Sequence, residues 1–312
     1  MTKTHFSRRM VLATGAASIV LPHSTFGQSI ESPVEGGIGG TGIVGLLTEF
    51  GSLVVSGNYI RTDAQTRYTD GYGVLRERHL RLGDSLTIEA SGPSHALVAR
   101  RVHVTHPLVG PITAITRGGR EILVNGVAVT FERPLRGYAV GARVAVSGLW
   151  QGSQVRASGV APARSDQDLV SGDVTRGGGF GRLRIGGAMV QGRGLGGLPV
   201  GSFATVVGRY MPVENVMSAS SSKAGRFFGT AGPLQRLSIE GYLAPTDSAP
   251  GYKIEGLGHS FARNLRLDNY ANKRMLFNGG YTGRFAAQSA IELPESSGQR
   301  NRVLSRLSLQ NR

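Results

Sequence analysis

The chain has 312 residues, 47 of them glycine and none cysteine, and its 35 Lys and Arg against 20 Asp and Glu give a formal net charge of +15. Without cysteine, disulfides, thiolate metal sites and cysteine nucleophiles are excluded. The length suits several small domains as well as one large one. The charge favours polyanionic partners such as nucleic acid, acidic polysaccharide, lipid headgroups or an acidic protein, although scattered arginines also fit a generally basic surface.

Residues 1–29 have the pattern of a removable export signal. Ser7-Arg8-Arg9 precedes the apolar run Met10–Val20, which resembles a twin-arginine signal, with an ordinary Sec signal as the alternative. The run is shorter than the ~20 residues that a membrane-spanning helix needs. We therefore expect a periplasmic or secreted mature protein without a transmembrane segment.

Glycine-rich residues 30–42 lack periodicity, which predicts a flexible linker. The next segment, residues 43–107, reads as a first β-barrel unit with strands near 43–50, 53–55, 59–62, 85–90 and 96–104. An insertion over Asp63–His79 interrupts it.

Residues 108–163 form the clearest unit. Asn125-Gly126 is the pair that best tolerates a type I′ hairpin turn, and Val127 and Val129 follow it with the period of two that places side chains on one face of a strand. Glycines interrupt every helical pattern in this stretch. A β-meander is predicted.

The same pattern recurs in a third unit, residues 164–223. In each unit a glycine follows an apolar residue, at Leu82-Gly83, Val140-Gly141 and Val200-Gly201. Three residues later come Leu86, Val144 and Ala204, and five residues later come Ile88, Val146 and Val206. A slip of one residue would destroy this match, so a repeat of about 60 residues is predicted. Gly57, Gly126 and Gly186 mark the central hairpin turns.

Beyond the third unit the pattern weakens. Residues 224–293 are interpreted as a divergent fourth β unit, with a helical turn near His259–Leu265. Residues 294–312 are basic and lack aromatic side chains, which predicts a disordered tail.

Gly36–Gly42 (GGIGGTG), Ile43-Val44-Gly45, Phe50-Gly51-Ser52 and the threefold recurrence resemble an exported bacterial family, the domain of unknown function DUF5666. The resemblance covers about residues 36–223. It implies small OB-like β-barrels in tandem and no catalytic residues. The predicted fold class is therefore all-β, with tandem five-stranded OB-like β-barrels in three clear copies and one divergent β unit.

No cofactor site is predicted. Two G-x-G-x-x-G matches, Gly37–Gly42 and Gly192–Gly197, are expected by chance in so glycine-rich a chain. Neither lies between a strand and a helix, as phosphate binding at such a loop requires.

No catalytic or metal site is predicted either. His103 and His106 point to opposite faces of a regular strand, so His79, His95, His103 and His106 do not form a ligand set. The acids are scattered and no G-x-S-x-G motif occurs. A Ser–His–Asp triad stays open, because its members need not be neighbours in sequence.

Eight residues are candidates for ligand binding, because they combine guanidinium and aromatic groups. They are Tyr59, Arg61, Arg67, Tyr68 and Tyr72 around the first-unit insertion, and Arg176, Phe180 and Arg182 in an RGG-like turn. Stacking and charge on an OB-like barrel can hold single-stranded nucleic acid or oligosaccharide. The alternative is that these tyrosines pack in the core and the glycines only form turns.

The function predicted is an exported, non-enzymatic binding or scaffold module for a protein partner or an anionic polymer of the cell envelope. The alternative is an OB-like nucleic-acid or oligosaccharide-binding protein. Export makes nucleic acid the less favoured partner.

Overall fold

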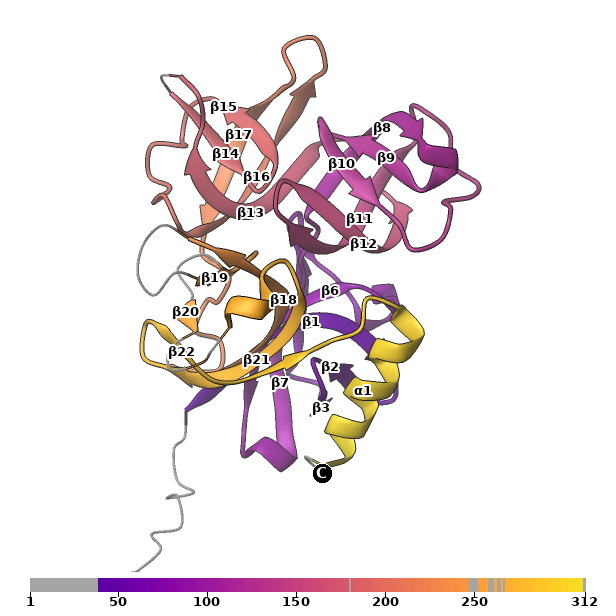
Figure 1. The fold of residues 1–312 in the computed structure, drawn as a ribbon. Coiled ribbons are helices and arrows are strands. Elements are labelled where there is room, and N and C mark those ends of the chain that lie inside the picture. Colours follow the sequence, from indigo (N-terminus) through magenta and orange to yellow (C-terminus); the bar gives the residue numbers. More distant parts are fainter. Residues whose placement is uncertain are drawn as a thin grey trace, which may run out of the picture. The chain divides into compact units, whose positions relative to one another are not determined.

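The structure, a computed structural model, describes residues 39–179, 181–246, 252–257, 261–262, 265 and 267–310. These residues form twenty-two strands, β1 to β22, and one α-helix (Figure 1). The predicted all-β class is confirmed. The predicted export signal lies outside the described residues, as does most of the helical turn predicted near His259–Leu265, of which residues 261–262 form a strand instead. The one described α-helix is too short and too polar to cross a membrane.

Residues 108–162 and 168–224 each close into a five-stranded barrel. The strands are β8 (Leu108–Thr116), β9 (Glu121–Val124), β10 (Val127–Thr130), β11 (Arg143–Gln151) and β12 (Gln154–Pro162), then β13 (Asp168–Arg176), β14 (Arg182–Ile185), β15 (Ala188–Gln191), β16 (Phe203–Met211) and β17 (Val216–Ala224). In each barrel the fifth strand runs parallel to the third, and the fourth closes onto the first. This is the Greek-key barrel of the OB type, whose closure removes free edges.

The first unit has the same pairings. Its five strands are β1 (Gly40–Glu49), β2 (Leu53–Val55), β3 (Asn58–Arg61), β6 (Ser85–Ser91) and β7 (Leu97–Val104). β7 runs parallel to β3, and β6 pairs with β1. The insertion adds β4 (Arg67–Asp70) and β5 (Gly73–Val74), and β4 pairs in parallel with β7, beyond the part of β7 that pairs with β3.

The prediction of a flexible linker over residues 30–42 is wrong at its end. β1 begins at Gly40, because it pairs in parallel with β18 (Leu234–Pro245). A Cβ atom on Gly42 would lie 2.8 Å from the ring of Phe227, and one on Gly40 would lie 2.9 Å from the carbonyl oxygen of Ala231. These glycines therefore permit close packing.

The divergent fourth unit follows the same plan. Its strands are β18, β19 (Tyr252–Ile254), β20 (Phe261–Ala262), β21 (Arg274–Tyr281) and β22 (Phe285–Glu292). β18 pairs antiparallel with β19 and β21, and β20 runs parallel to β22. These pairings correspond to those of the other units, although the sequence pattern is weak here.

The register predicted for three units is confirmed, and the fourth unit shares it. The turn glycines Gly83, Gly141 and Gly201 have φ near +90°, and Asn272 takes their place in the fourth unit with φ +61°. Asn is the residue that best replaces Gly in this left-handed region. The residues three and five positions later are buried in every copy, namely Leu86, Val144, Ala204 and Met275, then Ile88, Val146, Val206 and Phe277.

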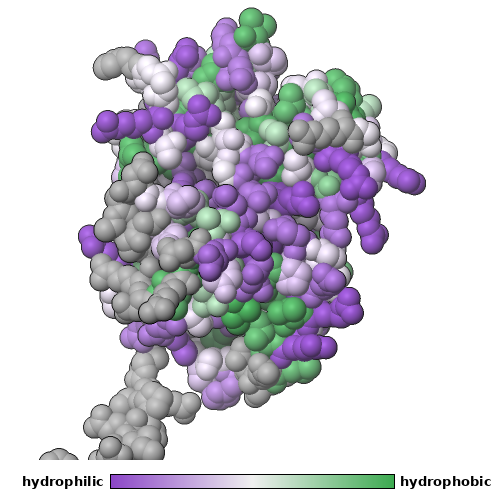
Figure 2. Space-filling model, viewed as in Figure 1, coloured by the Kyte–Doolittle hydropathy of each residue, from purple (hydrophilic) through white to green (hydrophobic). Residues whose placement is uncertain are grey.

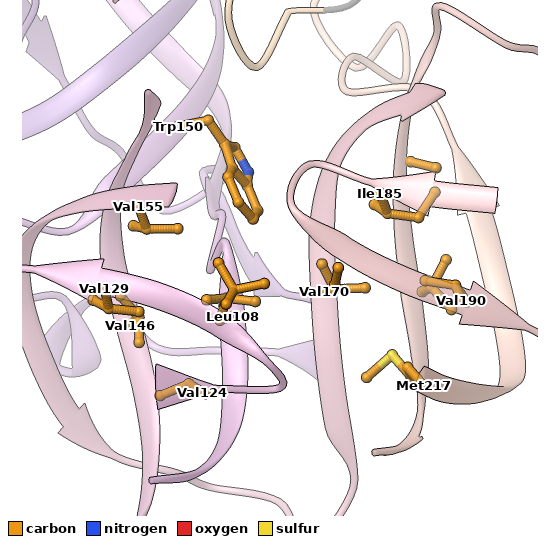
Figure 3. Close-up of a cluster of buried hydrophobic side chains, with 14 of the residues drawn as sticks. Leu108, Val124, Val129, Val146, Trp150, Val155, Val170, Ile185, Val190 and Met217 are labelled. Atoms are coloured by element: carbon orange, nitrogen blue, oxygen red, sulfur yellow. The ribbon is translucent and has the colours of Figure 1, made fainter. Parts of the chain in front are cut away.

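One apolar core joins the second and third barrels (Figure 3). Val129 and Val146 face the interior of one barrel, and Val190 and Met217 that of the next. Trp150 lies between the two groups, where its indole Nε1 donates a hydrogen bond to the Ser171 carbonyl at 2.7 Å. These two barrels are therefore packed together.

The prediction of a disordered tail over residues 294–312 is also wrong for helix α1 (Ser297–Gln310). Leu304 is fully buried with Leu276 and Leu293, and the Arg300 guanidinium lies 3.6 Å from the buried carboxylate of Glu240. The basic composition of this segment predicted disorder. The helix is instead held by Glu240, which lies in β18, far away in sequence.

The face of the molecule shown in Figure 2 is mainly hydrophilic where it is coloured, and its apolar side chains form separate groups. This agrees with the high formal charge. Charged and polar contacts are the natural way for such a face to meet a partner.

Candidate functional site: a basic cavity between two barrels

A cavity of about 530 Å³ is lined by strands of the first and third units. Arg101 and His103 of β7 line one side, and Phe203, Thr205 and Val207 of β16 line the other. β17 and the segment that follows it complete the wall. This volume lies in the range of small-ligand sites.

The strand period explains why polar side chains gather here. Val102 and Val104 of β7 point into the first barrel and are buried, so Arg101 and His103 point outward. In β16 the buried residues Ala204 and Val206 leave Thr205 on the outer face in the same way. The cavity therefore lies between the outer surfaces of two barrels.

The insertion of the first unit extends this surface. Arg67 lies opposite Arg101 in the parallel pairing of β4 with β7, and Thr69 lies opposite His103. Thr69 Oγ1 and His103 Nδ1 are 2.9 Å apart and hydrogen-bonded. The insertion thus contributes a further cation to the cavity.

Glu89 lies behind the cavity wall and holds three of the residues that line the cavity. Its carboxylate is fully buried, lies 3.4 Å from the Arg101 guanidinium, and accepts hydrogen bonds from the backbone N–H groups of Phe228 and Thr230. The buried carboxylate of Glu89 therefore positions both Arg101 and the segment that contains Phe228.

Two aromatic rings in the lining hold cations. The Phe228 ring centroid is 4.2 Å from the Arg101 guanidinium carbon and 3.8 Å from Lys223 Nζ. The Arg226 guanidinium lies 3.9 Å from the ring centroid of buried Phe203. Such cation–π contacts hold long side chains in place without neutralising them.

Arg226 itself is 9% exposed. Its guanidinium donates hydrogen bonds to Thr87 Oγ1, at 3.1 Å, and to the Gly256 carbonyl, while Nε has no hydrogen-bond partner among the described residues. Burial lowers the pKa of Arg226 to about 10, so it stays charged at neutral pH.

Positive charge predominates in the lining. Arg67, Arg101, Lys223 and Arg226 line the cavity together with one acid, Asp70. Among the described residues, neither Arg67 nor Lys223 forms an ion pair with a carboxylate.

Asp70 is engaged elsewhere. Its carboxylate accepts hydrogen bonds from Arg164, at 3.1 Å, and from the backbone N–H of Tyr72, at 2.8 Å. The lining therefore offers an anion several cations and little competing negative charge.

His103 adds a neutral polar group. Burial, together with the charges of Arg101, Arg226 and Lys223, lowers the pKa of His103 to about 3. The imidazole is uncharged at neutral pH. Within the described residues no group of three or more His, Asp or Glu side chains could hold a metal ion.

The structure separates most of the predicted ligand-binding residues. Among the eight, Arg67 lines the basic cavity. Tyr68 packs against the core of the first barrel, and the Tyr72 hydroxyl donates a hydrogen bond to the Gln167 carbonyl at 2.8 Å. Tyr59 and Arg61 lie on β3.

The RGG-like turn lies apart from this lining. Arg176 and Arg182 are exposed where β13 and β14 meet, and Phe180 lies outside the described residues. Of the four histidines, His103 lines the basic cavity, His79 and His106 line another, and His95 is exposed in the turn before β7.

Arg101, Lys223, Arg226 and Phe228 were not predicted as site residues. Val102 and Val104 point into the barrel, and their alternation was the signal that could have placed Arg101 on the outer face. The buried Leu97 and Ala99 give the opposite phase, because a bulge separates them from Arg101. What the sequence did not show is that the outer faces of the first and third units line the same cavity.

Fold and cavity together define an all-β protein of tandem OB-type barrels with a basic cavity between barrels. Residues 41–103 match the family model described as a domain of unknown function, DUF5666, the family that the sequence resembles, so that prediction is confirmed for this segment. The match includes Arg67, Arg101 and His103 of the cavity. No curated protein and no solved structure matches the chain.

Proposed function

We propose that the protein is a non-enzymatic binding module that holds an anionic polymer of the bacterial cell envelope in its basic cavity. One observation carries this proposal. Four cationic side chains line the cavity, and its single acid is bound to Arg164. An anion entering the cavity would meet Arg67 and Lys223, which form no ion pair among the described residues, beside Arg101, which is paired with Glu89.

A periplasmic or secreted location is part of the proposal. It rests on Arg8, Arg9 and the apolar run that follows them. Export would bring the cavity into the compartment where envelope polymers are found.

The test is the affinity of the mature protein for fluorescently labelled polyphosphate and polygalacturonate at low and raised salt. We expect the affinity to fall as salt rises. The double variant Arg67→Ala/Lys223→Ala should bind roughly tenfold more weakly, since two partly exposed ion pairs contribute about 1–2 kcal/mol.

The matched control is Arg193→Ala/Arg209→Ala, which removes the same charge from exposed positions outside the cavity lining. This variant should bind almost as the unchanged protein does. An equal loss in both double variants would mean that overall charge, not the cavity, binds the polymer.

A further inference from the structure

We infer that the ligand of the basic cavity is an acidic polysaccharide, a chain of sugar rings that carry both hydroxyl and anionic groups. The inference rests on the proposed function and adds to it the chemical class of the polymer. Three features of the lining carry it: hydroxyls placed beside cations, aromatic rings already in contact with cations, and a volume suited to a short segment.

Hydroxyl groups lie beside the cation Lys223 on the hairpin of β16 and β17. Thr205 lies directly opposite Lys223, and Val207 lies opposite Ser221. Directly opposed side chains in such a hairpin have Cβ atoms about 5 Å apart. With their Cβ atoms this close, the ammonium of Lys223 and the hydroxyl of Thr205 can contact an anionic group and a hydroxyl of one sugar ring.

The hydroxyls beside the cations are available for a ligand. Among the described residues, Thr205, Ser221 and Thr230 line the cavity, and no side-chain hydrogen bond within the chain occupies them. Thr69 and Thr105, by contrast, are bonded to His103 and Thr87. A hydroxyl-rich ligand can therefore replace the water that these groups would otherwise bind.

The aromatic side chains argue against single-stranded nucleic acid. OB-type proteins that bind it stack bases on open aromatic rings. Here Phe203 is buried beneath Arg226, and Phe228, although 39% exposed, already holds both Arg101 and Lys223 against its ring. Tyr59, Tyr68 and Tyr72 are not among the residues that line the cavity.

The cavity volume of about 530 Å³ holds a ligand of drug-like size. A short segment of polysaccharide fits this volume, with the rest of the chain extending into solvent. Hydrogen bonds from Thr205 and Ser221 would then distinguish sugar rings from a polymer with charge alone.

The test compares three probes of similar charge: an oligogalacturonate, a polyphosphate and an oligodeoxythymidine. Isothermal titration calorimetry at one salt concentration measures their affinities for the mature protein. We expect oligogalacturonate to bind roughly tenfold more tightly than the other two. The variant Thr205→Val/Ser221→Ala should lose about tenfold in oligogalacturonate affinity, as two hydrogen bonds of about 0.5–1.5 kcal/mol each predict.

Binding of polyphosphate to this variant should be unchanged, which also shows that its cavity is intact. Ser218→Ala, at an exposed position of β17 outside the lining, is the control and should leave all three affinities as they are. Equal or tighter binding of oligodeoxythymidine or polyphosphate, or no effect of the hydroxyl variant, would overturn the polysaccharide while anion binding stands. If none of the probes binds, the proposed function fails as well.

Discussion

At the scale of single residues, the cavity depends on a carboxylate that does not itself face the ligand. Glu89 is fully buried, pairs with Arg101 and accepts two backbone hydrogen bonds from the segment around Phe228. Breaking one side of a buried ion pair leaves an uncompensated charge and costs much more than the pair contributes.

We expect Glu89→Gln to lower the free energy of unfolding by about 3 kcal/mol and to weaken anion binding, because Arg101 and Phe228 lose their anchor. Urea denaturation measures the first effect and titration with polyphosphate the second. Glu214→Gln, at an exposed position, should change neither. A Glu89→Gln protein of normal stability would show that the anchor is unimportant.

The pKa of His103, lowered to about 3 by burial and three nearby cations, predicts a dependence of stability on pH. The unfolded chain binds a proton at this residue below about pH 6.5, whereas the folded protein does so only near pH 3. Stability should therefore fall as pH decreases through this window. His103→Gln should show a shallower slope, by up to about 1.4 kcal/mol per pH unit.

Urea unfolding at a series of pH values between 4 and 7 measures both slopes. Identical slopes for the variant and the unchanged protein would mean that His103 is not held neutral. Its imidazole resonances in an NMR titration give an independent reading, with the neutral form expected throughout this range.

At the scale of elements, one irregularity recurs at the same place in every unit. The pairing of the fourth and fifth strands shifts register at Gly148, Gly208 and Gly279, and at Ala90 in the first unit. A Cβ atom on any of these three glycines would overlap a carbonyl oxygen of the neighbouring strand. Bulges of this kind bend the sheet so that a small barrel can close.

Gly208→Ala should therefore lower the free energy of unfolding by more than about 2 kcal/mol, as overpacking against backbone does. Gly196→Ala is the matched control, because its new Cβ atom would meet nothing within 4 Å. This change should be neutral or slightly stabilising. Equal denaturation midpoints for the two variants would contradict the role assigned to the bulge.

Helix α1 packs against several units. Besides its buried Leu304, the Ser297 N–H donates a hydrogen bond to Glu132, which follows β10, and the Ser305 hydroxyl donates one to Glu49 of β1. Its packing against strands far away in sequence makes it part of the fold.

We expect Leu304→Ala to lower the free energy of unfolding by about 2–5 kcal/mol, the usual cost of emptying a buried leucine site. Leu309→Ala removes the same side chain from a position that is 62% exposed and should change stability by less than about 0.5 kcal/mol. Thermal unfolding followed by circular dichroism compares the two. Similar melting temperatures would indicate that the helix is not docked.

These elements show how far the sequence could predict the fold. Alternation and the turn glycines predicted the inward positions of Val144 and Val146 correctly, because the strand period is a local property. Helix α1 was missed because its stability comes from Glu240 and Leu276, which lie far away in sequence. The same holds for the start of β1 at Gly40, whose partner is β18.

At the scale of the whole molecule, the cavity could not be predicted from any single unit. Arg67 was predicted as a ligand-binding residue because it lies in an arginine- and tyrosine-rich insertion. The structure places it beside Arg101. Lys223 lies more than a hundred residues away, in another barrel. Only the packing of barrels brings these charges to one site, and no local pattern encodes that packing.

The location of the ligand tests this account most directly. A deuterated, ¹⁵N-labelled sample titrated with oligogalacturonate reports the backbone amides whose chemical shifts change. We expect the changes to concentrate in β4, β7, β16, β17 and the segment around Phe228. Changes confined to the turn between Arg176 and Arg182, or spread evenly over the exposed arginines, would contradict a binding site in the basic cavity.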